Sequence, residues 1–305
     1  QTAYLKAHYP VEFMASVLTS EKADVERIAV LIDECKKMEV EVLPPNINES
    51  LKNFTVVSGQ NKIRFGLLAI KNVGENIANT IVEERKKAGQ YKSIGDFIYR
   101  VQSKDLNKKS MEALIKAGAF DAFAERNQLL FNLEKLLEIA RESQKSKQSG
   151  QIGLFSSVAT SNNNDIKLQE TKPAGNFERL TWEKELLGLY VSSHPLNDYK
   201  KLFETKTTAI SKIDDNWVDR KIILGGIISG VKKIITKTGK PMIFMKLEDL
   251  TAKTEVVVFP NLLERNPEAL QENKIVFVAG RIDNRNNELK VVADDVQEIL
   301  VPREA

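Results

Sequence analysis

Hydrophobic and polar residues follow two different periods along this chain. Over 4–37 and 127–141, apolar residues recur every three or four positions, which is typical of amphipathic helices. In the last third they alternate with polar residues, which is typical of strands with one buried face. A short hairpin is expected where 54–57 and 62–65 flank a polar turn. The pattern therefore predicts an α+β multidomain chain, with a helical N-terminal half followed by a β-rich C-terminal part.

The C-terminal part has the element order of a small barrel. Its five predicted strands, with one helix between the third and the fourth, cover 221–235, 242–247, 254–259, 261–270, 274–282 and 288–293. Five strands with a helix at this position indicate a five-stranded OB-type β-barrel. Such barrels bind single-stranded nucleic acid by stacking bases on aromatic side chains beside basic residues.

Phe244 is the predicted stacking residue of this barrel. Alternation along the second strand directs Ile243, Met245 and Leu247 to one face. Phe244 and Lys246 then lie on the other face. The predicted single-strand-binding residues are Phe244, Lys246, Lys237, Lys240 and Arg281. Because 220–299 holds 13 basic and 11 acidic residues, a barrel that only positions neighbouring domains stays an open alternative.

Residues 67–81 have the spacing of two short helices joined by a tight turn. Leu67 and Ile70 face one way, and Ala78 and Ile81 pack the second helix against them. We expect Gly74 to adopt positive φ, because it has no Cβ to clash. The second helix would then begin with free N–H groups that donate to a phosphate oxygen without reading a base. The predicted phosphate-binding residues are Lys71, Asn72, Val73, Gly74 and Asn76. A helical hairpin without a ligand is the alternative.

A second turn opens a helix within 106–120. Lys108 and Lys109 lie in its first turn, where cations oppose the helix dipole unless an anion is bound. Gly118 is placed to end the helix. Both lysines are predicted to contact phosphate, and a solvated charged turn is the alternative. Local charge favours phosphate, because 62–116 holds 12 basic against 6 acidic residues, whereas the whole chain holds 45 against 42.

The polar stretch 142–172 is expected to be flexible, because it has too few apolar residues to offset the entropy of ordering it. Within it, Gln151, Leu154 and Phe155 have the character of a peptide that docks in a pocket of another protein. The alternative is that Leu154 and Phe155 pack on their own domain. Farther along, His194 precedes a proline and is expected to cap or pack rather than to catalyse.

Composition makes several functions improbable for the chain alone. With two histidines and one cysteine, Cys35, we expect no disulfide, no thiolate zinc site and no Cys–His catalysis. The acid pairs 214–215 and 294–295 are interpreted as solvated surface rather than as metal ligands. No apolar run is long enough for a membrane span, and the single cysteine suits a reducing cytoplasm. We therefore predict no catalytic residue, no metal site and no cofactor within this chain.

Four segments, in this order, resemble one protein family. They are 1–14 (QTAYLKAHYPVEFM), 63–74 (IRFGLLAIKNVG), 117–121 (AGAFD) and 186–196 (LLGLYVSSHPL). They are similar to the bacterial replicative DNA polymerase III alpha subunit, of polymerase family C. Residues 67–81 also resemble the helix-hairpin-helix pattern of DNA repair and replication proteins, with Asn72 in place of the usual first glycine. Asparagine tolerates left-handed φ, so the departure is mild.

The resemblance implies a division of the chain. It assigns the end of the fingers to 1–50, a helix-hairpin-helix domain that holds duplex DNA to 51–141, a linker to 142–172, a helical connector to 173–216 and an OB domain to 217–305. Residues 151–155 would dock in the sliding clamp. The parent would be a DNA-directed DNA polymerase, a nucleotidyltransferase, whose palm aspartates and Mg²⁺ lie upstream, so this fragment alone should be inactive. Other replicative subunits are implied partners.

Two functions of other classes stay open at this point. One is a stand-alone module for DNA repair or recombination, with the same two kinds of domain. The other is a protein-interaction scaffold whose barrel binds no nucleic acid. Duplex affinity that falls steeply with salt would exclude the scaffold.

Overall fold

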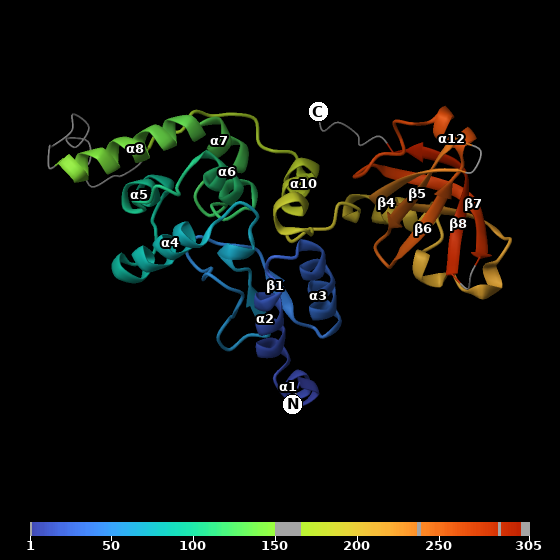
Figure 1. Cartoon of the computed structure of the whole chain (residues 1–305), viewed down its shortest axis with the longest axis horizontal. Helices are drawn as coiled ribbons and strands as arrows, with labels where there is room; N and C mark the ends of the chain where they lie inside the picture. Colours follow the sequence, from blue (N-terminus) through green and yellow to red (C-terminus); the bar gives the residue numbers. More distant parts are fainter. Residues whose placement is uncertain (1, 150–165, 237–238, 286–287, 300–305) are drawn as a thin grey trace. The chain divides into compact units, whose positions relative to one another are not determined.

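The computed structural model describes residues 2–149, 166–236, 239–285 and 288–299. The chain forms two compact units, Gln1–Ser192 and Ser193–Ala305. The first is mainly helical and the second contains a closed barrel (Figure 1). The predicted α+β, multidomain architecture is confirmed.

Three helices begin the first unit and account for the predicted helical stretch 4–37. They are α1 (Thr2–His8), α2 (Pro10–Ser20) and α3 (Val25–Lys37). Pro10 occupies the first turn of α2, where its missing N–H costs nothing. The carboxylate of Asp24 caps α3 by accepting a hydrogen bond from the Arg27 N–H at 3.0 Å. Each break between these helices therefore has a local cause in the sequence.

A small three-stranded sheet follows these helices. Its strands are β1 (Glu41–Leu43), β2 (Thr55–Val56) and β3 (Lys62–Arg64), in the order β1-β3-β2. The antiparallel pair β2–β3 is the predicted hairpin, which is confirmed. The parallel partner β1 was not predicted, because three residues are too short to give a period.

Four elements after the sheet flank the two predicted turns. They are the 3-10 turn η1 (Leu67–Ala69) and the helices α4 (Glu75–Ala88), α5 (Ile94–Arg100) and α6 (Lys108–Lys116). The first expected helix is thus a single 3-10 turn. The four apolar residues predicted to pack these elements together, Leu67, Ile70, Ala78 and Ile81, are at most 1% exposed. Their packing is therefore as predicted.

The helix predicted at 127–141 is two helices, α7 (Arg126–Phe131) and α8 (Leu133–Ser149), divided at Asn132. The prediction of flexibility from residue 142 is wrong for 142–149, which continue α8. Gln102 donates to the Ser143 hydroxyl at 3.2 Å and Gln144 donates to the Ser103 carbonyl at 3.1 Å, so the end of α8 is tied to the preceding loop.

The far end of the predicted linker is also ordered. Ile166 and Leu168 pack on the core of the first unit. Lys135 donates to the Lys167 carbonyl at 3.0 Å, and Asn127 donates to the Lys172 carbonyl at 3.3 Å. Side-chain hydrogen bonds to the main chain therefore supplement the packing of these two apolar residues.

The predicted connector 173–216 is divided between the two units rather than forming one element. Helix α10 (Asn176–Leu187) belongs to the first unit, where Leu186 and Leu187 join its core. The second unit begins with η2 (Asn197–Tyr199), α11 (Lys200–Lys206), η3 (Ile210–Lys212) and η4 (Asp215–Trp217). The edge of the Phe203 ring on α11 fills the space above Gly225, where a Cβ would clash. Packing divides the connector, which the sequence period does not reveal.

The second unit contains the predicted barrel. Its strands are β4 (Lys221–Ile235), β5 (Pro241–Glu248), β6 (Lys253–Val258), β7 (Ile275–Arg285) and β8 (Glu288–Glu298), closed in the order β4-β5-β6-β8-β7. Ile243, Met245 and Leu247 point into its core, as predicted. Helix α12 (Pro260–Arg265) is shorter than expected, because Asn266 precedes a proline and cannot readily stay helical.

Candidate nucleic-acid interface

The turn before α4 places its left-handed residue differently from the prediction. Asn72 has φ 71°, whereas Gly74 has φ −82°. The expectation of positive φ at Gly74 is therefore wrong, because Asn72, which tolerates the left-handed region, already reverses the chain. A Cβ at Gly74 would meet no atom within 4 Å. Neither the backbone conformation nor the internal packing of this unit requires a glycine there.

Helix α4 begins without a side-chain cap. Four other helices of the same unit have one, supplied by Asp24, Ser93, Asn107 and Glu125. No side chain caps α4 at Gly74. Because the first N–H groups of a helix have no partner within it, an uncapped start can bind an anion.

A cavity of about 290 Å³ lies at this helix start. It is lined by Asn72, Gly74, Glu75, Asn76, Ile77, Asp105, Asn107 and Ser110. The first five come from the turn before α4 and its first residues, and the last three from the turn before α6 and its first residues. The tertiary structure thus brings both predicted turns to one cavity. Glu75 and Asp105 contribute carboxylates, and the Lys52 ammonium pairs with that of Glu75 at 3.1 Å.

Two main-chain N–H groups of this turn are already used within the protein. The Lys71 N–H donates to the Leu186 carbonyl at 3.0 Å, and the Val73 N–H donates to the Ile70 carbonyl at 3.1 Å. Val73 is also buried. Lys71 can therefore contribute its exposed ammonium, whereas Asn72, Gly74 and Asn76 are exposed at the cavity.

The second turn differs from the first because its helix caps itself. The Asn107 side chain accepts from the Ser110 N–H at 3.1 Å, and the Ser110 hydroxyl accepts from the Asn107 N–H at 3.1 Å. Gly118 ends α6 with φ 82°, as predicted. The N–H groups of Gly118 and Ala119 return to the carbonyls of Ile115 and Leu114, which is a Schellman motif.

Lys108 and Lys109 are exposed at the start of α6, outside the cavity lining. The Lys108 ammonium lies 2.6 Å from the Glu134 carboxylate on α8. Their hydrogen bond raises the pKa of Lys108 and lowers the pKa of Glu134. The Glu134 carboxylate therefore occupies the position beside Lys108 where the sequence predicted a phosphate.

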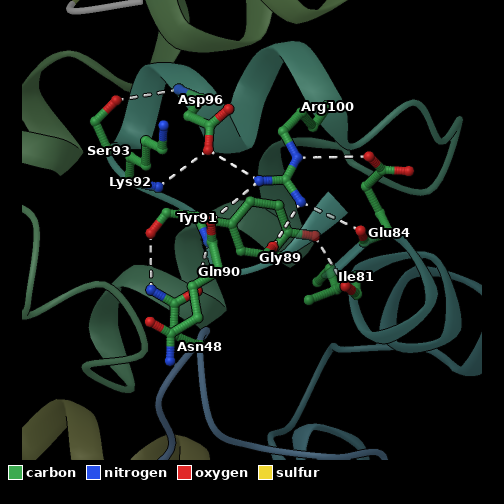
Figure 2. A network of polar contacts seen from close by, with 10 residues as sticks. All are labelled: Asn48, Ile81, Glu84, Gly89, Gln90, Tyr91, Lys92, Ser93, Asp96 and Arg100. Atoms are coloured by element: carbon green, nitrogen blue, oxygen red, sulfur yellow. Dashed lines mark hydrogen bonds and ion pairs between the residues drawn. The ribbon is translucent and has the colours of Figure 1, made fainter. Parts of the chain in front are cut away.

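A polar network fixes the loop between α4 and α5 (Figure 2). The Asn48 side-chain amide bonds the Tyr91 main chain in both directions at 2.8 Å, and the Tyr91 hydroxyl donates to the Ile81 carbonyl at 2.8 Å. The Arg100 guanidinium lies 4.4 Å from the Tyr91 ring centroid and donates to the Gly89 carbonyl at 2.8 Å. Burial raises the pKa of Tyr91, so its hydroxyl keeps its proton. The network therefore holds α4 and α5 in one fixed arrangement.

Strand register places Phe244 and Arg281 in one row on the outer face of the barrel. Phe244 is opposite Val257, Val257 is opposite Val292, and Val292 is opposite Arg281. Lys232 on β4 is the other neighbour of Phe244. The row therefore carries an apolar centre with a basic residue at each end. Lys232 was not among the predicted residues, although alternation along β4 would have turned it outward.

Phe244 is half-covered by its own barrel. It packs with Met242, Val257 and Val292, and the Lys290 ammonium lies 5.7 Å from its ring centroid. Ion pairs with Glu255 at 2.7 Å and Glu288 at 3.2 Å hold Lys290 there and raise its pKa. A base that stacks on this ring would have to displace the ammonium or stack beside it.

The other predicted residues have different surroundings. Lys246 is exposed opposite Glu255 on the neighbouring strand, and Lys240 is exposed at the start of β5. Lys237 and the peptide residues Gln151, Leu154 and Phe155 lie outside the described residues. The His194 Nδ1 accepts from the Leu196 N–H at 3.2 Å, which agrees with the predicted capping role.

No metal donor set occurs in the part of the chain that the structure describes, where no three His, Cys, Asp or Glu side chains lie close enough together to hold an ion. The Mg²⁺ implied by the family therefore has no fitting site among these residues. None of the described helices is long and apolar enough to cross a membrane.

Comparison with known families defines the class of both regions. Residues 39–129 match a model of the helix-hairpin-helix motif, and residues 222–299 match a model of the OB-fold nucleic acid binding domain. The first match spans both turns at the cavity, and the second spans the barrel. The chain is therefore of a nucleic-acid-binding class with these two domain types.

Known relatives match nearly the whole of this chain. The chain is 39% identical to DNA polymerase III subunit alpha of Thermus aquaticus over 97% of its length, and 38% identical to that of Deinococcus radiodurans over 98%. Identity to the Aquifex aeolicus subunit is 39% over 99%. The chain is thus homologous to one portion of the bacterial DNA polymerase III alpha subunit. It spans about a quarter of the length of these relatives, namely 24%, 23% and 24%.

Proposed function

We propose that this chain is the DNA-holding part of a replicative DNA-directed DNA polymerase. Its first turn would bind the sugar–phosphate backbone of duplex DNA at the start of α4, and the outer row of the barrel would bind single-stranded template. Homology to polymerase III alpha subunits over nearly the whole chain favours this function over a stand-alone repair module.

The uncapped start of α4 is the observation that carries the proposal. It combines a glycine that the unit does not itself need with exposed Asn72 and Asn76 at an open cavity. The absent Cβ leaves room for a ligand backbone to approach the N–H groups. A phosphate oxygen suits these donors and the positive end of the helix dipole. The exposed ammonium of Lys71 adds a charge beside them.

The second turn would support this site rather than duplicate it. Its capping box already satisfies the Ser110 N–H, and Glu134 pairs with Lys108. Of the two lysines, Lys109 is then the better candidate for a phosphate contact. Its ammonium takes part neither in the capping box nor in the ion pair between Lys108 and Glu134. This division makes the first turn the main backbone contact.

Further roles come from the family. The parent activity would be nucleotidyl transfer, with Mg²⁺ bound by residues outside the described part of this chain. The parent would act in the cytoplasm with other replicative subunits. Residues 151–155 would dock in the sliding clamp, and replacing Leu154 and Phe155 together by alanine should abolish binding to a purified clamp. A matched control replaces Asn162 and Asn163 by alanine in the same segment, and this variant should bind normally.

Duplex binding tests the main proposal. Fluorescence anisotropy with a labelled duplex of arbitrary sequence should give a Kd of about 10⁻⁴ to 10⁻⁶ M that rises steeply with salt, since phosphate contacts release counterions. Gly74→Asp should weaken binding by about tenfold or more, because its carboxylate caps α4 and repels the phosphate. The protein should stay equally stable.

Gly175→Asp is the matched control. Gly175 also begins a helix, α10, without a side-chain cap, and a Cβ there meets no atom within 4 Å. The new carboxylate therefore adds the same charge at another helix start, and duplex affinity should change by less than about twofold at moderate salt. Equal losses in both variants, or binding that is independent of salt, would refute the proposal.

A further inference from the structure

Helix α10 ends in a buried ionic network. The Glu183 side chain is 1% exposed, and its Oε1 accepts from the Arg126 Nη2 at 3.1 Å. Its Oε2 accepts from the N–H groups of Val191 and Ser192 at 3.0 and 2.9 Å, and from the Ser192 hydroxyl at 3.1 Å. A buried carboxylate needs donors of this kind, and four of them converge here. Glu183 therefore fixes residues 191–192, where the first unit ends.

The same network reaches the end of α6, the helix that follows the second turn. Arg126 is 2% exposed and donates to both carboxylate oxygens of Asp121 at 2.9 and 2.7 Å. Its Nη1 donates at 3.0 Å to the carbonyl of Lys116, the last residue of α6. A Cβ at Gly118 would clash with the guanidinium, so this glycine also makes room for the network. The arrangement connects the end of α6 to residues 191–192 through two side chains.

Helix α10 also contacts the first turn. The Leu186 carbonyl accepts the Lys71 N–H at 3.0 Å, immediately before the left-handed Asn72. One helix is thus bonded to the turn that begins α4 and, through Arg126, to the helix that follows the other turn. Its last residues lead directly to the segment that enters the barrel unit.

We propose that Arg126 and Glu183 are positioning residues that transmit binding of duplex at the two turns to the exit segment 188–192. The inference rests on the proposed function. Duplex held at both turns restricts their motion, and α10 is bonded to the first turn and, through Arg126, to the far end of the helix that follows the second turn. Residues 191–192 can open only if Glu183 loses buried hydrogen bonds, so a more rigid α10 makes opening rarer. Bound duplex would then fix the point at which the chain leaves the first unit.

Hydrogen exchange of the full 305-residue chain tests this inference. With a saturating 20-base-pair duplex of arbitrary sequence, exchange at the Val191 and Ser192 amides should slow by about threefold or more. Glu183→Gln should exchange rapidly at both amides with or without duplex. Its duplex affinity should fall by no more than about threefold, because the coupling is reciprocal. Glu185→Gln, at an exposed position of the same helix, should behave like the parent chain.

The outcomes separate the two proposals. Duplex binding with unchanged exchange of these amides in the parent chain would overturn the inference and leave the proposed function intact, even if Glu183→Gln does not fold. No duplex binding would overturn both. Slowing that persists in a folded Glu183→Gln variant would show that another route links the turns to the exit segment, and would overturn the assigned role of Glu183.

Discussion

The side-chain amide of Asn132 forms two hydrogen bonds with the main chain of Gln169, 37 residues away in sequence, each 3.0 Å long. Asn132 lies at the break between α7 and α8 and is 4% exposed. It binds the backbone rather than a side chain of the returning segment. The position of the segment that begins at residue 166 therefore depends on this asparagine as well as on hydrophobic burial.

Asn132→Ala should lower the free energy of unfolding of the first unit by about 1–2 kcal/mol, because the two hydrogen bonds to Gln169 and a third, to the Gln128 carbonyl at 2.8 Å, are lost beside partly hydrated groups. Exchange at the Gln169 amide should increase. Asn127→Ala removes one exposed hydrogen bond of 3.3 Å to the same segment and should cost less than about 0.5 kcal/mol. Denaturant midpoints measure both changes, and equal losses would contradict a special role for Asn132.

Gly118→Ala should be much more destabilising than Gly59→Ala. Both glycines have positive φ, 82° and 71°, so each alanine costs about 1 kcal/mol in backbone strain. A Cβ at Gly59 meets nothing within 4 Å, whereas one at Gly118 clashes with the buried Arg126 guanidinium. Thermal and chemical unfolding should give a total loss of about 2–4 kcal/mol for Gly118→Ala. If both glycine variants lose the same free energy of unfolding, the Arg126 side chain can move away from the added methyl group at no cost.

Phe244→Ala should weaken binding of the chain to single-stranded DNA by about 1–3 kcal/mol through lost stacking. Ile223→Ala is the control, because Ile223 is 48% exposed on β4 but lies outside the row that contains Phe244. It should have little effect on anisotropy titrations with a labelled single strand. If both variants bind like the parent, the barrel face does not stack bases.

Cys35 should resist thiol reagents in the folded chain. It is fully buried, and burial raises its pKa to about 11. At pH 8 about one thiol in a thousand would be ionised, and the thiolate is the reactive form. Labelling at pH 8 should therefore be slow in buffer and rapid in denaturant. Rapid labelling without denaturant would contradict the described packing of α3.

Acid should weaken the barrel unit through Glu248. Burial raises the pKa of Glu248, but His194 and Lys253 outweigh it, so the folded pKa lies below the ordinary value. Ionised Glu248 therefore stabilises the folded barrel unit. This contribution to the free energy of unfolding is complete above the unfolded pKa of about 4.3 and is lost as pH falls through the lower folded pKa.

Glu248→Gln should flatten that pH dependence of barrel stability. The measurement is denaturant unfolding between about pH 3 and 6, followed by the fluorescence of Trp217 in a Trp182→Phe background. Trp217 belongs to the barrel unit and Trp182 to the first unit. An unchanged pH profile in Glu248→Gln would show that other groups control the acid response.

The sequence by itself determined the local features of this protein. Periods of apolar residues predicted the helical stretches 4–37 and 127–141 and all five barrel strands, and Gly118 was correctly predicted to end α6. These features depend on backbone sterics and on the side chains of a few neighbouring residues, which the sequence states directly. The inward and outward faces of β5 were predictable for the same reason.

Only the tertiary structure decided which distant residues meet. It brought Asn76 and Asn107 to one cavity, paired Lys108 with Glu134, and aligned Phe244 with Arg281 by strand register. It also gave the left-handed position to Asn72 instead of Gly74. Such outcomes depend on loop closure and on packing between separate elements. Those interactions join residues far apart in sequence, so no local pattern contains them.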